Sequence, residues 1–153
     1  MPIDIDIQRV STSVTMPDDH QFQLWAETIL DGKRDEAVLV VRIVDEEEAC
    51  RFNHDYRGKD YASNVLSFPL ELPAGLPVEI ANLHLGDILL CAPVVAREAL
   101  EQKKQEAHHW AHLMIHGVLH LLGYDHENIA DAQAMESLEK ESLATLGIND
   151  PYH

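Results

Sequence analysis

Cysteine is scarce in this sequence, and long apolar runs are absent. The two cysteines, Cys50 and Cys91, do not form a Cys-x-x-Cys pair, which argues against a thiolate metal site and favours reduced thiols. No apolar stretch approaches the ~20 residues of a membrane-spanning helix. The N-terminus lacks the basic start and apolar core of a secretory signal. We therefore expect a cytoplasmic protein without a membrane partner.

Basic residues are also few: 11 lysines and arginines stand against 27 acidic residues, giving a formal net charge of −16. Such a field repels polyanions at long range, so charge alone disfavours nucleic acid as a partner. A nucleic-acid function would need a local basic patch. The candidates for such a patch are Arg57, Lys59, Arg97, Lys103 and Lys104.

The length of 153 residues fits one domain, residues 1–153. Alternating or β-branched patterns predict strands at residues 3–8, 37–44, 64–68 and 84–91. Apolar periodicity and glycine stops predict helices near residues 18–31, 45–57, 93–105, 106–122 and 131–146. The proline- and glycine-containing segment 71–82 is expected to be a loop. The order predicts an α+β fold in which about five helices pack on a four-stranded mixed sheet.

Histidine, in contrast, is abundant. Five of the ten histidines lie between residues 108 and 120, and His112, His116 and His120 are spaced by four, which aligns them on one helix stripe. Eight residues of helix span roughly 12 Å, so His112 and His120 cannot share one ion. The helix therefore offers at most one pair of ligands four residues apart.

His126 is the natural third ligand, because Gly123 can end the helix and turn the chain back toward His116 and His120. Three neutral imidazoles and one open position are typical of a catalytic zinc site, although other divalent transition metals also suit imidazole. Asp125 can orient a ligand histidine or be a solvated turn residue. For His108, His109 and His112 we favour surface or core roles.

The pair resembles the zincin motif His-Glu-x-x-His, but Gly117 stands where that motif has its general base. The glycine argues against peptide hydrolysis and is neutral toward metal binding.

Four segments then resemble one known family, the YbeY endoribonucleases. They are HGVLHLLGYDH at 116–126, YRGKDYASNVLSFP at 56–69, LGDILLC at 85–91 and DPY at 150–152. The resemblance implies a zincin-like fold and a metal-dependent, single-strand-directed endoribonuclease of ribosomal RNA 3′-end processing and ribosome maturation or quality control. It implies one zinc ion on His116, His120 and His126, with Arg57 as a catalytic or RNA-contacting residue. Its partners would be ribosomal RNA, the ribosome and proteins on it.

Arg57 also makes chemical sense, because a guanidinium can bind a phosphate through two hydrogen bonds and neutralise developing charge. Asp87 can face the metal site from its strand or have a structural role. Two alternatives stay open: a ribosome-assembly factor with a structural metal, and a metal-dependent hydrolase of another substrate. The attacking group, water or a ribose 2′-hydroxyl, and the general base also stay open.

Overall fold

The computed structural model describes residues 2–70, 73–125 and 127–152. Its sheet has the strand order β1-β2-β4-β3, with β1 (Ile3–Arg9), β2 (Ala37–Val44) and β4 (His84–Cys91) mutually parallel. Strand β3 (Val65–Pro69) runs antiparallel to β4 and forms an edge. The predicted α+β fold with a four-stranded mixed sheet is confirmed. The helices are α1 (Asp19–Leu30), α2 (Glu46–Arg57), α3 (Val78–Leu83), α4 (Ala92–Glu101), α5 (Glu106–Leu121) and α6 (Ile129–Thr145).

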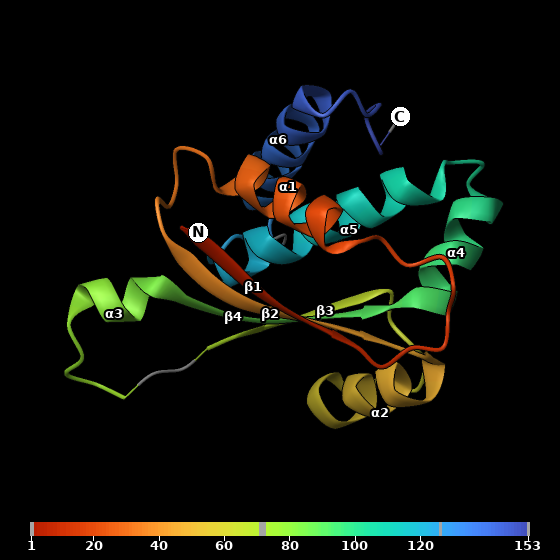
Figure 1. Ribbon diagram of the computed structural model, residues 1–153, viewed down its shortest axis with the longest axis horizontal. Coiled ribbons are helices and arrows are strands. Elements are labelled where there is room, and N and C mark those ends of the chain that lie inside the picture. The colour runs from red at the N-terminus through yellow and green to blue at the C-terminus, as the bar shows by residue number, and fades with distance from the viewer. Residues whose placement is uncertain (1, 71–72, 126, 153) are drawn as a thin grey trace.

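The sheet separates two helical layers: α2 covers one face, and α1, α5 and α6 lie over the other (Figure 1). Alternation along β4 divides its side chains between them. Ile88 and Leu90 join the large core under α1 and α5, whereas Leu89 and Cys91 join a smaller cluster under α2. Strand β2 is therefore central and largely buried, as its β-branched run predicts.

Helix α5 is the central helix of the larger layer, and most of its surface is buried. Trp110 packs edge-on against Phe22 of α1, with ring centroids 6.1 Å apart. Both rings are fully buried, and each such burial stabilises the fold by roughly 1.5–3 kcal/mol. This packing holds the histidine-bearing helix α5 against α1.

The connection between β3 and β4 differs from the prediction. The last part of the expected loop, from residue 78 to 82, belongs to the short helix α3 (Val78–Leu83), on an arm that extends away from the rest of the domain (Figure 1). At the start of β4 a β-bulge shifts the register with β2, and Gly86 adopts φ +135°. A Cβ at Gly86 would collide with the Phe68 carbonyl oxygen, so only glycine fits there.

Asp45 occupies the N-cap position of α2, but its carboxylate does not cap the helix. It accepts hydrogen bonds from Ser11 and Thr12 instead. Within the described ranges, no helix has the length and apolar character that crossing a bilayer requires.

Candidate metal centre and adjoining cleft

Two of the three predicted ligands meet at the C-terminal end of α5. The Nε2 atoms of His116 and His120 lie 3.1 Å apart. Two nitrogens on a tetrahedral zinc ion, each bonded at about 2.0–2.1 Å, lie about 3.4 Å apart. The pair therefore fits one ion with only a small adjustment of the rings.

The third predicted ligand, His126, lies outside the described residues. The turn that leads toward it has the predicted form: Gly123 adopts φ +102°, and the Tyr124 amide donates to the Leu119 carbonyl at 3.0 Å. Asp125 lines the same cleft as His116 and His120. Whether three histidines share an ion stays a prediction from the sequence.

On the other side of its ring, His116 contacts Glu139, a residue of α6 that the sequence analysis did not identify. The His116 Nδ1 and Glu139 Oε1 atoms are 2.7 Å apart, and the side chain of Glu139 is fully buried. The Tyr152 hydroxyl donates to Glu139 Oε2 at 2.6 Å, and His112 Nε2 lies 3.3 Å from Oε1. His112 is therefore part of a polar network rather than a surface residue.

The electrostatics of Glu139 follow from these contacts. Burial acts to raise the pKa of the carboxyl group, but hydrogen bonds from His112, His116 and Tyr152 outweigh it and lower the pKa to about 2. Burial, with the bond to Glu139, raises the pKa of the Tyr152 hydroxyl. At neutral pH, Glu139 is accordingly an ionised carboxylate, and Tyr152 is a neutral hydrogen-bond donor.

Glu139 also completes a second arrangement that can hold a metal. Ligand atoms of His112, His116 and Glu139 all lie within 4.8 Å of one another. The structure thus contains a possible metal site, consistent with a metal-dependent enzyme. This group faces α6 and Tyr152, whereas His116 and His120 open into a cleft on the opposite side. His116 belongs to both arrangements, one through each ring nitrogen.

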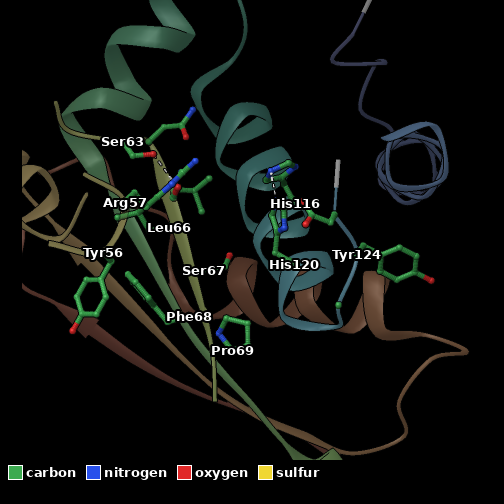
Figure 2. Close-up of a pocket in the computed structure, with 14 residues that line it drawn as sticks. Tyr56, Arg57, Ser63, Leu66, Ser67, Phe68, Pro69, His116, His120 and Tyr124 are labelled. Carbon is green, nitrogen blue, oxygen red and sulfur yellow. Dashed lines mark hydrogen bonds between the residues drawn. The ribbon is translucent and has the colours of Figure 1, made fainter. Parts of the chain in front are cut away.

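The cleft has a volume of about 620 Å³ and runs between α5 and the edge strand β3. Figure 2 shows Arg57 and Leu66 on one side of it and His116 and His120 on the other. Arg57 is the last residue of α2, on the opposite face of the sheet, so its side chain reaches the cleft around the edge of β3. The structure therefore brings Arg57 and two predicted metal ligands to one cavity.

Local structure at the end of α2 determines where Arg57 lies. Gly58 adopts φ +67° and its amide donates to the His54 carbonyl at 3.0 Å, which ends the helix directly after Arg57. The fully buried Asn53 donates to the Tyr61 carbonyl at 2.8 Å and fastens the following loop. Among the described residues Arg57 forms no ion pair, so its guanidinium can receive a phosphate.

The basic residues named from the sequence do not form one patch. Arg97 pairs with Glu46 at the other end of α2, roughly 16 Å along the helix from Arg57. Lys103 and Lys104 line a separate cavity beside the N-terminal end of α5. Arg57 is the one lysine or arginine that lines the metal-site cleft within the described part of the chain.

Asp87 does not face the histidines. Leu85 packs in the core under α5, and regular alternation would place Asp87 on the same side. The bulge at the start of β4 reverses the alternation, so Ile88 takes that side and Asp87 is exposed on the opposite face. The expectation for Asp87 was therefore wrong.

The packing around Gly117 explains why the glutamate of the zincin motif cannot occupy this position. A Cβ at residue 117 would lie 3.1 Å from Cγ2 of Ile88 and 3.3 Å from Oγ of Ser67. The Ser67 hydroxyl donates to the Gly117 carbonyl at 3.1 Å. Residue 117 thus faces the sheet, where a Cβ already crowds Ile88 and Ser67 and a glutamate side chain has no room.

Comparison with known proteins decides the family. The model of the family described as endoribonuclease YbeY matches residues 6–147. The chain belongs to the YbeY endoribonuclease family. The predicted membership is confirmed, and with it the enzyme class of this family, a nuclease.

Individual relatives agree with this assignment. Endoribonuclease YbeY of Xanthomonas axonopodis pv. citri is 55% identical over 150 residues, covering 98% of this chain and 93% of that protein. Endoribonuclease YbeY of Halorhodospira halophila is 52% identical, covering 98% and 96%. The solution structure of TM1509 from Thermotoga maritima, 23% identical with a TM-score of 0.58, covers 92% of this chain and 91% of that one and shows the fold.

Proposed function

We propose that this protein is a zinc-dependent, single-strand-directed endoribonuclease, with His116, His120 and His126 as the zinc ligands and Arg57 as the catalytic phosphate-binding residue. We further propose that it acts in the cytoplasm, in ribosomal RNA 3′-end processing and ribosome maturation or quality control, together with proteins on the ribosome. The relatives named endoribonuclease YbeY support the substrate class.

The observation that carries the proposal is the shared cleft of Arg57 and the His116–His120 pair. The chemistry that a zinc ion supplies in such a site is Lewis-acid activation of water and of a phosphoryl oxygen. Arg57 would bind the scissile phosphate and stabilise the charge that develops on its oxygens. A guanidinium held opposite the ligand pair suits a phosphodiester better than a peptide bond.

Preference for single strands is supported by Tyr56, beside Arg57. Its ring stacks on Phe52, with centroids 5.8 Å apart and planes at 11°, and packs edge-on against Phe68 at 5.1 Å. Two-thirds of Tyr56 is nevertheless exposed, at the rim of the cleft. A supported aromatic ring with an open face can stack on an unpaired base, which a duplex does not offer.

The metal assignment is tested with two matched variants, His112→Ala and His120→Ala. The two histidines lie one helical turn before and after His116, and each forms part of only one possible site. We expect wild type and H112A to retain one zinc per chain by elemental analysis, and H120A to lose it. The reverse pattern would assign the metal to His112, His116 and Glu139 and refute the proposed ligand set.

Activity is tested with unpaired and duplex RNA, with casein as the alternative substrate, each with and without chelator. We expect chelator-sensitive cleavage of unpaired RNA by wild type, loss of cleavage in Arg57→Ala with zinc content unchanged, and no action on casein. If wild type binds zinc but leaves RNA intact, the nuclease proposal fails. A 2′,3′-cyclic phosphate on the products would identify the ribose 2′-hydroxyl as the attacking group.

The net charge of −16 predicts few phosphate contacts, which salt dependence can count. For single strands each phosphate contact contributes about −0.7 to the slope of log K against log salt. We expect Arg57→Ala to make this slope less negative by about 0.7. An unchanged slope would show that Arg57 does not contact an RNA phosphate.

A further inference from the structure

The buried carboxylate of Glu139 is unusual for this helix face. Met135, Glu139 and Leu143 are spaced by four along α6, and all three are buried. Met135 and Leu143 belong to the large hydrophobic core, so Glu139 occupies a position where an apolar residue would be expected. An isolated carboxylate there costs several kcal/mol, and the surrounding donors offset that cost.

The direction of the hydrogen bond between His116 and Glu139 determines which ring nitrogen of His116 can bind a metal. Because a carboxylate only accepts hydrogen bonds, the 2.7 Å contact to His116 requires a hydrogen on Nδ1 of the imidazole. In the neutral ring, Nε2 then carries the lone pair, and this is the atom that lies 3.1 Å from His120 Nε2 in the cleft. The carboxylate thereby selects the tautomer that can bind a metal from the Arg57 side.

Tyr152 holds the carboxylate in that orientation. Its hydroxyl donates to Oε2 at 2.6 Å, which leaves Oε1 for His116 and prevents the carboxylate from rotating. The ring of Tyr152 also packs edge-on against the ring of His112, with centroids 5.4 Å apart. The segment that follows α6 therefore fixes the metal-binding helix through Glu139.

We infer that Glu139 is a positioning residue of the metal centre, not a ligand, and that Tyr152 holds it in place so that His116 presents Nε2 to the cleft. This inference rests on the proposed function only for the identity of the ligands. Carboxylates that accept from a metal-bound histidine typically raise metal affinity about 10–100-fold.

The first test needs no metal. In the metal-free protein, ¹⁵N–¹H correlation spectra of the histidine side chains report which ring nitrogen carries hydrogen. We expect the Nδ1–H form of His116 in wild type and in Glu139→Gln, whose amide oxygen still accepts. We expect the Nε2–H form to become populated in Glu139→Ala. An Nε2–H form in wild type would overturn the inference.

The second test measures zinc affinity by competition with a chromophoric chelator. We expect Glu139→Ala to weaken binding by about 10–100-fold, Glu139→Gln to lie between it and wild type, and Tyr152→Phe to weaken binding less than Glu139→Ala. The exposed Glu141→Ala on the same helix is the control and should match wild type. Equal affinities in wild type, E139A and Y152F would overturn the inference.

Folding is checked by circular dichroism. If E139A does not fold, Glu139→Gln and Tyr152→Phe decide: both must bind zinc more weakly than wild type, and unchanged affinity in both overturns the inference. Absorption spectra of the cobalt-substituted protein distinguish a metal ligand from a positioning residue. If Glu139 is a ligand, its loss in E139Q changes the coordination band, whereas loss of a positioning contact leaves the band unchanged. A wild type without metal would refute the proposed function while the tautomer result still stood.

Discussion

Substituting alanine for Gly117 sets two effects of opposite sign against each other. Alanine in a helix interior is favoured over glycine by about 1 kcal/mol. Its Cβ would lie 3.1 and 3.3 Å from two carbons of Ile88, and forcing a methyl group into a packed core costs about 1–3 kcal/mol. Displacement of the 3.1 Å bond from Ser67 to the residue 117 carbonyl costs about 1 kcal/mol more. We therefore expect a net destabilisation of about 1–3 kcal/mol.

Urea unfolding of four proteins checks this expectation: wild type, Gly117→Ala, Ile88→Val and the double variant. Ile88→Val removes Cδ1, one of the two crowded carbons, and on its own costs about 0.5–1.5 kcal/mol. The double variant should be more stable than the sum of the single losses by at least about 0.5 kcal/mol, since neighbouring residues couple. A Gly117→Ala protein that is more stable than wild type would refute the claim that α5 has no space against the sheet.

Three further substitutions test other parts of the structure. Gly86→Ala should destabilise the fold by about 2–5 kcal/mol, through collision with the Phe68 carbonyl and the positive φ; a change below about 0.5 kcal/mol in urea unfolding would contradict this. Tyr56→Ala should raise KM for unpaired RNA about 5–150-fold, because stacking contributes ~1–3 kcal/mol per base, while Tyr56→Phe stays near wild type; equal KM values would exclude stacking. Arg42 donates two hydrogen bonds to Glu48 and thereby lowers the pKa of that carboxyl below its ordinary 4.5. The pair's contribution, at most about 1 kcal/mol, is therefore present above pH 4.5 and is lost as the pH falls through the lowered pKa. Glu48→Gln should thus be less stable than wild type at pH 7, and this deficit should shrink as the pH falls below 4.5; a deficit that does not change with pH would contradict this sign.

Local patterns predicted most of the fold because each strand and helix carries its own periodicity and its own stop. The histidine spacing predicted the His116–His120 pair, since helix geometry alone brings residues four apart together. Gly123 likewise has the positive φ that its place after α5 indicated.

What the sequence did not predict depends on contacts between distant elements. Glu139 lies 23 residues from His116, and only tertiary packing brings the two together. A signal was present, a charged residue in an otherwise apolar stripe of α6, but it does not name the partner. Asp87 was misplaced because the extra residue of a β-bulge reverses the alternation and leaves little trace in the sequence.

Arg57 lies in the helical layer on one face of the sheet, and the histidines lie in the layer on the other face. This separation affects how the activity can be lost. Because strand β3 stands between them, stripping the ion should leave the guanidinium where it is, and removing the guanidinium should leave the imidazoles undisturbed. In the proposed mechanism, RNA binding by Arg57 should therefore not depend on the metal, although cleavage needs both groups. We expect a metal-free protein still to bind RNA and to compete with the active form for it.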